Sequence, residues 1–179
     1  MSLTINGKNP ETITIGGKAV ESLSISGEIV WSVAPSGPDY FYIENAYPGN
    51  NDITLKKNGS PSTGTTLEYS LDKNAWTLCT YDSNNQCVVS LPNRGDRVYF
   101  RSTNGFSQSS SNYYNIKSTQ AIKTAGDLST LLDYTDNDLN TATSYGFYQM
   151  FAENITGMVN VIDYSKLTTL SQSCYNGMF

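Results

Sequence analysis

Three oxygen-bearing residues at alternate positions are the first candidates for chemistry. Asp136, Asp138 and Asn140 have the spacing with which calcium-binding loops begin, and calcium prefers carboxylate and amide oxygens. Such a loop also needs glycine at its sixth position and a bidentate glutamate at its twelfth. Those positions hold Thr141 and Phe147. An ordinary turn rich in Asp and Asn is therefore favoured over a metal site.

The sequence lacks most of the residue combinations that enzymes use for catalysis. It contains no histidine, which removes the usual general base, the usual zinc ligand and every Ser-His or Cys-His pair. It has no glycine-rich phosphate loop and no nucleophile elbow. A glycan hydrolase would need two carboxylates facing each other at about 5–9.5 Å, and no motif nominates them. We therefore expect no enzyme and no cofactor.

The cysteines Cys79, Cys87 and Cys174 are an odd set, which argues against a disulfide framework. Cys79 and Cys87 could face each other across a hairpin. Two reduced, half-buried thiols are the favoured interpretation in a reducing compartment.

Tyrosine is abundant, with 13 copies. Tyr40, Tyr42, Tyr113 and Tyr114 could stack on sugar rings, although such residues more often complete a sandwich core or an interface. These four are the candidate ligand contacts.

Charge and hydropathy narrow the possible partners. The net charge is −5, and no basic cluster occurs along the sequence, which argues against nucleic acid as a ligand. No apolar run approaches the roughly 20 residues of a membrane helix. The N-terminus lacks the basic start and apolar run of a signal peptide, so we expect a protein made in the cytosol without membrane insertion.

A ten-residue repeat fills the N-terminus. Residues 3–12, 13–22 and 23–32 align without a gap, and each unit pairs a short β-branched strand with a two-residue turn. The turns are Asn6-Gly7, Gly16-Gly17 and Ser26-Gly27, dipeptides that suit tight hairpins. The pattern predicts a small meander or one short coil per repeat. The hairpin edge of a larger domain is the alternative.

These short strands bury too little apolar surface to be stable alone. Either the next domain covers them or copies of the chain associate, and a threefold β-prism is the preferred arrangement. The expected anchor and oligomer interface is formed by the apolar rows Ile5, Ile15, Ile25, Val20, Val30 and Trp31.

Two segments of this repeat carry a resemblance. Ile5-Asn6-Gly7-Lys8 and Ile29-Val30-Trp31-Ser32 resemble a short module at the start of many tail and fibre proteins of bacterial viruses. The resemblance implies that residues 1–33 anchor the chain to a virus particle.

The segment 34–38, Ala-Pro-Ser-Gly-Pro, breaks any strand and is the expected linker. Beyond it, residues 39–118 contain short strand-like runs at about 8–12-residue spacing, which favours a β-sandwich of immunoglobulin (Ig) or fibronectin type. The expected strands are Tyr40–Ile43, Ile53–Lys57, Thr66–Leu71, Ala75–Tyr81, Gln86–Leu91, Arg97–Ser102 and Tyr113–Lys117.

Alternation predicts which side chains of this sandwich face inward. We expect Trp76, Val98 and Phe100 to point into the core, and Arg97, Tyr99 and Arg101 to point out. Arg94-Gly95-Asp96 is the tripeptide that integrins bind, but here it precedes a strand, where Gly-Asp favours a simple turn.

Part of the middle segment also resembles a known domain. Residues 68–72, Trp76, residues 90–92 and residues 95–101 are similar to the Ig-like domain found beside leucine-rich surface repeats in gut Bacteroidetes and their viruses.

The pattern changes from Gly126 onward. Asp127 is the expected N-cap of a short helix over Leu128–Tyr134. Residues 147–151 are echoed by residues 174–179, with Met150 and Met178 separated by 28 positions. This period is typical of solenoid units, so residues 119–179 are expected to form a cap and a first repeat.

The blocks Lys166–Leu170 and Cys174–Phe179 closely resemble leucine-rich repeats of the BspA type. Residues 155–158 depart from the family's Cys-x-x-Leu strand, as first repeats often do when they act as caps. Because a solenoid end exposes its apolar face, we expect the natural chain to continue beyond Phe179.

Composition and strand pattern predict a mainly β protein, and the resemblances imply a protein of a bacteriophage particle, from a crAss-like or other gut Bacteroidetes phage. It would act in the head, collar or tail fibre as a trimer, with other virion proteins and a host-surface glycan or protein as partners. A BspA-like bacterial surface adhesin or carbohydrate-binding protein is the alternative.

Overall fold

The computed structural model describes two compact units, Met1–Gly37 and Pro38–Phe179. The residues described are 13–15, 18–20, 22–25, 28–32, 39–59, 66–103, 106, 109–136, 139, 141–142, 144–152, 157–158, 167, 169–171, 173–176 and 178. In this part of the chain, no helix has the length and hydropathy that crossing a membrane would require.

The N-terminal unit contains two antiparallel hairpins. Strand β1 (Ile13–Ile15) pairs with β2 (Lys18–Val20), and β3 (Ser22–Ile25) pairs with β4 (Glu28–Ser32). Each register leaves two residues between the strands, as the predicted tight turns require. Ile5 lies outside the described residues, and the other expected interface positions fall within these strands: Ile15, Val20, Ile25, Val30 and Trp31.

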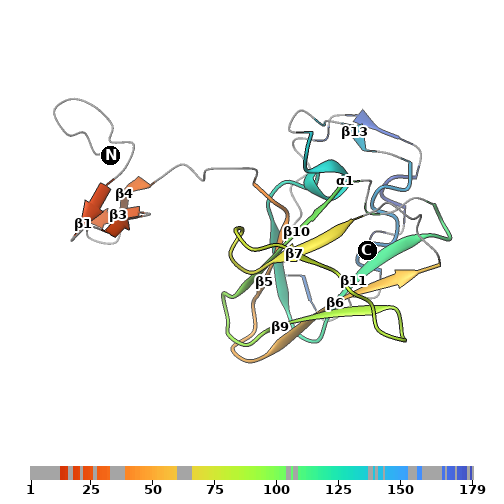
Figure 1. The fold of residues 1–179 in the computed structure, drawn as a ribbon, viewed down its shortest axis with the longest axis horizontal. Coiled ribbons are helices and arrows are strands. Elements are labelled where there is room, and N and C mark those ends of the chain that lie inside the picture. The colour runs from red at the N-terminus through yellow and green to blue at the C-terminus, as the bar shows by residue number, and fades with distance from the viewer. Residues whose placement is uncertain are drawn as a thin grey trace. The chain divides into compact units, whose positions relative to one another are not determined.

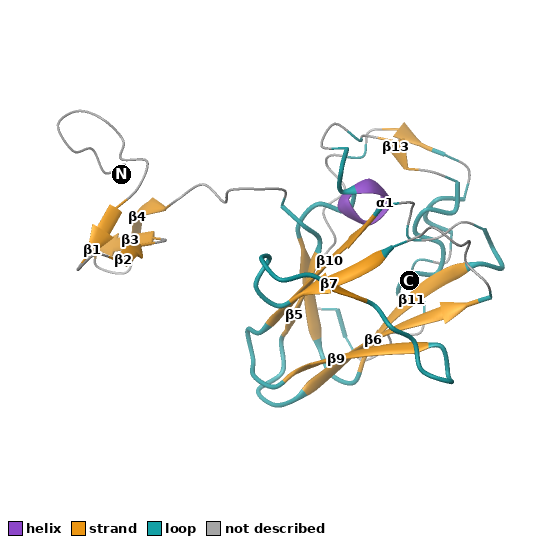
Figure 2. Ribbon diagram, in the orientation of Figure 1, coloured by secondary structure: helices purple, strands orange, loops and turns teal. Residues whose placement is uncertain are grey.

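The second unit is built mainly of β-strands in two antiparallel sheets (Figures 1 and 2). The five-stranded sheet has the order β12-β5-β10-β7-β8 and the three-stranded sheet the order β11-β6-β9. In the first, the strands are β5 (Tyr42–Asn45), β7 (Leu67–Ser70), β8 (Thr77–Leu78), β10 (Arg97–Ser102) and β12 (Ile122–Ala125). In the second, they are β6 (Asn51–Asn58), β9 (Gln86–Leu91) and β11 (Tyr113–Ser118).

Alternating apolar residues of both sheets form the core. In β6 the side chains of Ile53 and Leu55 are fully buried while their neighbours are partly exposed, and β10 buries Val98 and Phe100 as predicted. Successive side chains of a strand point to opposite faces, so this pattern sets the inner face of each sheet. Burying one such side chain contributes about 1.5–3 kcal/mol.

The five-stranded sheet extends past residue 118, where the sequence placed a domain boundary. Strand β12 pairs with β5 along four residues, from Ile122 opposite Asn45 to Ala125 opposite Tyr42. The segment that follows the expected boundary therefore supplies an edge strand to the sandwich.

Helix α1 (Thr130–Asp133) is shorter than the predicted helix. The Asp127 carboxylate accepts a hydrogen bond from the Ser129 N–H at 2.9 Å, which is the type of bond expected of a cap. The α-helix nevertheless begins only at Thr130, with Ser129 as its N-cap residue. Leu131 and Leu132 are buried, so burial holds this single turn in place.

The two similar C-terminal blocks lie alongside each other. Strands β13 (Thr141–Ala142) and β14 (Thr169–Leu170) pair in parallel, with each residue opposite the one 28 positions later. The backbone N–H groups of residues 147, 149 and 151 donate to the carbonyls of residues 174, 176 and 178 at 2.8, 3.1 and 2.7 Å. The repetition in the sequence thus corresponds to two stacked stretches of backbone.

The first of these blocks also attaches to the sandwich. The Ile116 N–H of β11 donates to the Met150 carbonyl at 2.6 Å, and the Asn115 side chain donates to the Gln149 carbonyl at 2.7 Å. The ring of buried Phe151 lies 6.5 Å from that of Phe41. Sandwich and C-terminal block therefore share one hydrophobic core.

Candidate functional site

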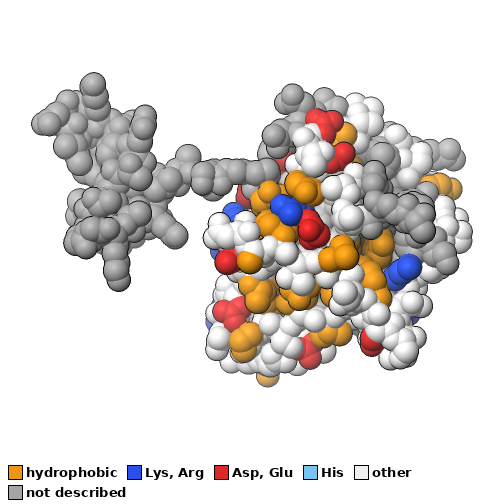
Figure 3. All heavy atoms as spheres, in the orientation of Figure 1, with side chains coloured by type: hydrophobic (Ala, Val, Ile, Leu, Met, Phe, Trp, Pro, Cys, Tyr) orange, Lys and Arg blue, Asp and Glu red, His pale blue; other side chains and the backbone are white. Residues whose placement is uncertain are grey.

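The outer face of the five-stranded sheet carries charged and aromatic side chains in ordered rows. Strand pairing places Lys123 beside Glu44 and Glu44 beside Arg97. A second row runs Ala125, Tyr42, Tyr99 and Ser70, and a third runs Arg101, Glu68 and Leu78. We call these rows and the side chains covering them the outer face. Figure 3 shows basic, acidic and hydrophobic side chains side by side on one surface of this unit.

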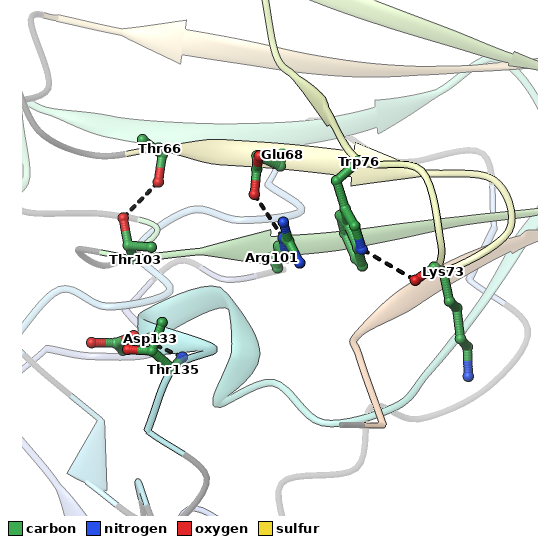
Figure 4. A network of polar contacts seen from close by, with 8 residues as sticks. All are labelled: Thr66, Glu68, Lys73, Trp76, Arg101, Thr103, Asp133 and Thr135. Atoms are coloured by element: carbon green, nitrogen blue, oxygen red, sulfur yellow. Dashed lines mark hydrogen bonds and ion pairs between the residues drawn. The ribbon is translucent and has the colours of Figure 1, made fainter. Parts of the chain in front are cut away.

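Arg101 is the centre of one half of the outer face. Its Nε donates to Glu68 Oε2 at 2.6 Å (Figure 4). Its guanidinium also lies between two rings, 4.1 Å from the centroid of Trp76 and 4.2 Å from that of Tyr134. Tyr40 packs against Trp76 in a T-shaped pair with centroids 4.6 Å apart. Cation–π and charge-assisted contacts of this kind reinforce each other.

The prediction that Trp76 points into the core is wrong. Trp76 is partly exposed, covers Arg101 on the outer face, and donates from its indole Nε1 to the Lys73 carbonyl at 3.1 Å. The cause is the turn before β8: Asp72 Oδ1 accepts the N–H groups of Asn74 and Ala75 at 2.8 and 2.9 Å. This Asx turn delays the strand, so an alternation extrapolated from residue 75 does not apply.

Tyr42 and Tyr99 occupy the centre of the other half, with ring centroids 5.4 Å apart. The guanidinium of Arg97 lies 4.6 Å from the Tyr42 centroid, and the ammonium of Lys73 lies 4.8 Å from that of Tyr99. Glu44 bonds to Arg97 at 2.8 Å and approaches Lys123 Nζ at 3.7 Å. Each ring on this half is thus covered by a cation.

These contacts affect the protonation of Tyr42 and Arg97. Burial raises the pKa of Tyr42, so its phenol stays neutral across the physiological range. Burial is the largest single effect and opposes the charge of Arg97, but the hydrogen bonds to Glu44 and Tyr99 and the attraction of Tyr42 and Glu44 together more than offset it, so the pKa of the guanidinium rises. The pKa of Arg101 is raised as well, so both guanidinium groups of the outer face stay charged at any physiological pH.

The four tyrosines predicted as ligand contacts separate in the structure. Tyr40 and Tyr42 lie on the outer face, whereas Tyr113 packs against Tyr148 with centroids 5.1 Å apart. Tyr114 is only 5% exposed and lies 5.5 Å from Phe106 and 6.0 Å from Tyr81. Because Tyr114 belongs to the core, it is not a surface contact.

Sequence reasoning missed most of the outer face. It had placed Arg97, Tyr99 and Arg101 on the outer side of a strand. The structure confirms this for Arg97 and Arg101, whereas Tyr99 lies on the same side but is only 8% exposed, beneath Lys73. The sequence did not predict that these residues lie beside Lys73, Glu44 or Lys123, because the order of the strands in the sheet determines those contacts.

The integrin-type tripeptide forms a turn, as predicted. Gly95 has φ of +91°, a conformation that glycine adopts without strain. Asp96 Oδ2 accepts the Asn93 N–H at 2.8 Å.

All three cysteines are free and buried. Cys79 and Cys87 do not pair across a hairpin, because Cys79 follows β8 of the five-stranded sheet and Cys87 lies in β9 of the three-stranded sheet. The hydrogen bond between their thiols, followed by burial, raises the pKa of Cys79, and the same bond lowers the pKa of Cys87. Both thiols are buried within the core.

The calcium candidates give no site in the described part of the chain. Asp136 is exposed, while Asp138 and Asn140 lie outside the described residues. Among the described residues, no three His, Cys, Asp or Glu side chains are grouped so as to hold a metal ion.

Comparison of this chain with protein-family models, curated proteins and solved structures found no match.

Arg101→Lys is expected to reduce the free energy of unfolding by about 1 kcal/mol, because an ammonium lacks the planar guanidinium that stacks between two rings. Chemical denaturation measures the loss. Lys56→Arg on the three-stranded sheet is the control, for which we expect no change. An Arg101→Lys protein as stable as the parent would contradict the stacking contribution.

Proposed function

We propose that this chain is a non-enzymatic structural and adhesion protein of a bacteriophage particle, part of its head, collar or tail fibre. In this proposal the N-terminal hairpins attach to other virion proteins, and the rest of the chain is displayed toward the host surface. The observation that supports an adhesive role best is the outer face, where exposed Arg97 and Lys123 lie on the same sheet as the partly exposed rings of Tyr40, Tyr42 and Trp76.

An Ig-like assignment of the sandwich is supported by its strand neighbours. In a constant-type Ig domain the strands are grouped ABED and CFG, so B lies beside E and C beside F. Here β6 lies beside β9 and β7 beside β10, which corresponds to those two pairs. The outer strands differ, because β5 pairs with β10 and β11 pairs with β6. We propose an Ig-like core with rearranged edges.

A leucine-rich solenoid of BspA type is proposed for the C-terminal segment. The parallel offset of 28 residues between β13 and β14 lies within the 20–45 residues of known solenoid repeats. Leu167, Cys174 and Met178 are buried, as the apolar positions of such a repeat would be. This segment would present the recognition surface of the particle.

Threefold association is proposed for the N-terminal hairpins. Among the described residues each hairpin forms a two-stranded sheet, and an isolated hairpin is marginally stable in water. Neighbouring copies or a virion protein would bury the apolar rows that the hairpins carry. Light scattering on the purified chain tests this: a trimer is expected, and a stable monomer would contradict it.

Two experiments test the function. Mass spectrometry and imaging of purified particles are expected to find the protein as a virion component, and its absence from particles would refute the virion assignment. Binding of the purified protein to host cells tests adhesion. Tyr42→Ala is expected to weaken cell binding about fivefold by removing the ring beneath Arg97. Tyr113→Ala, a tyrosine of β11, is the matched control and is expected to bind normally.

A further inference from the structure

Cationic side chains gather on the outer face of an acidic chain. The whole sequence has 11 Lys and Arg against 16 Asp and Glu. Lys73, Arg97, Arg101 and Lys123 lie on this face, where the ion pairs among the described residues involve Glu44 and Glu68. Asp39 adds a negative charge near Tyr42, and Asp72, which accepts a hydrogen bond from Ser70 of this face, adds another beside Lys73. The four cations and four carboxylates balance, so the face is locally neutral within a chain of net negative charge.

The four cations differ in their exposure and in how many contacts they already make within the protein. Arg101 is 16% exposed and is committed to Glu68 and two rings. Arg97 and Lys123 are 44% and 48% exposed, and they share the single carboxylate of Glu44, which is 17% exposed. One carboxylate cannot saturate the donors of both cations, so Arg97 and Lys123 each keep N–H groups with which to bond a further anion.

Lys73 has no carboxylate partner among the described residues. Its ammonium lies over the Tyr99 ring, and the neighbouring Asp72 carboxylate is occupied by backbone N–H groups of its own turn. A ring face attracts a cation without cancelling its charge. The Tyr99 ring therefore holds the Lys73 ammonium in place, and the ammonium can still pair with an anion.

The geometry determines what kind of ligand suits this surface. Arg97 and Lys73 cover the Tyr42 and Tyr99 rings, so the faces of those rings are not open to stack on a neutral sugar. The face instead presents fixed cation heads. A stacked guanidinium held by Glu44 has little rotamer freedom left to lose, which favours bonding to a planar carboxylate.

We propose that the outer face binds an acidic, carboxylate-bearing polysaccharide, with Arg97, Lys73 and Lys123 contacting its carboxylates. This inference rests on the proposed adhesive function and names the chemical class of the ligand. Several cations on one flat sheet suit a polymer with repeated charges, because each contact is individually weak and exposed.

The test compares two polymers immobilised for biolayer interferometry: alginate, which is a polyuronate, and dextran, which is neutral. The full chain is expected to bind alginate and not dextran. Raising the salt from about 0.05 M to 0.5 M should abolish the alginate signal, because the Debye length falls well below the spacing of the charges.

Matched variants separate charge recognition from folding. Arg97→Gln and Lys73→Gln are each expected to weaken alginate binding about threefold. Glu44→Gln should strengthen it by a similar factor, because it frees Arg97 and Lys123 from their own carboxylate. Lys56→Gln, on the outer side of the three-stranded sheet, controls for net charge and is expected to have no effect.

Three outcomes would overturn the inference. Equal binding of dextran and alginate would show that carboxylates are not recognised. An absence of alginate binding would also reject the inference. If the protein still adhered to host cells, the proposed adhesive function would stand. If it bound neither alginate nor host cells, the inference and the proposed function would both be rejected. DNA binding as tight as alginate binding, with the same response to Glu44→Gln, would indicate attraction to any polyanion.

Discussion

Phe151→Ala is expected to lower the free energy of unfolding of the unit Pro38–Phe179 by about 3–5 kcal/mol, the usual effect of removing a buried phenylalanine ring. Phe151 is 2% exposed and lies against Phe41 of the sandwich, while its N–H bonds to the Met178 carbonyl. Phe151 therefore connects the sandwich, which its ring contacts, with the second C-terminal block, to which its backbone N–H bonds. Denaturant unfolding followed by tryptophan fluorescence should show one cooperative transition moved to lower denaturant.

Leu71→Ala is the control for this experiment. Leu71 is 58% exposed, so its truncation should change the stability by no more than about 0.5 kcal/mol. If the C-terminal blocks formed an independent repeat, Phe151→Ala would leave the Trp76 signal of the sandwich unchanged and produce a separate early transition. That result would contradict the shared core.

Sequence patterns predicted the β class of the second unit, because short runs of alternating apolar and polar residues separated by turn residues fit few structures other than a β-sheet. Val98 and Phe100 point inward as expected, and β6, β9, β10 and β11 occupy nearly the predicted ranges. In these strands, local alternation and final burial agree. The N-terminal hairpins follow similarly from the dipeptides between their strands.

Features that depend on long-range pairing escaped prediction. The role of β12 as an edge strand of the sandwich is set by its bonds to β5, about 80 residues earlier. Tyr114 looked equivalent to Tyr113, but the inner position in β11 buries one ring and not the other. The outer face unites side chains of β5, β10, β12 and the turn after β7, so the sequence shows no basic cluster where the fold creates one.

The partners of the buried polar residue Asn45 could not be predicted from the sequence either, because several of them lie far along the chain. Its Nδ2 donates to the carbonyls of Gly49, Leu91 and Asn93 at 2.8, 3.0 and 3.1 Å. Its Oδ1 accepts the Tyr47 N–H at 2.9 Å and the Asn51 side chain at 3.3 Å. One fully buried amide thus joins the loop after β5 to the end of β9.

Asn45→Leu is expected to cost about 2–4 kcal/mol of unfolding free energy. The substitution keeps the volume similar but leaves buried backbone groups without partners, and each such group costs about 1–3 kcal/mol. Some of these carbonyls would recover bonds to water, which keeps the total below the full sum. Urea denaturation and amide hydrogen exchange of the loop after β5 would measure the global and local losses.

Asn50→Leu provides the matched control, because Asn50 is exposed and its side chain donates to Asp52 Oδ1 at 2.9 Å. Its loss is expected to change stability by less than about 0.5 kcal/mol. Since water replaces an exposed partner and cannot readily reach a buried one, the two asparagines should differ by several-fold in effect. Equal effects would mean that the Asn45 bonds add nothing beyond what solvent supplies, and the loop would then be held by its apolar neighbours alone.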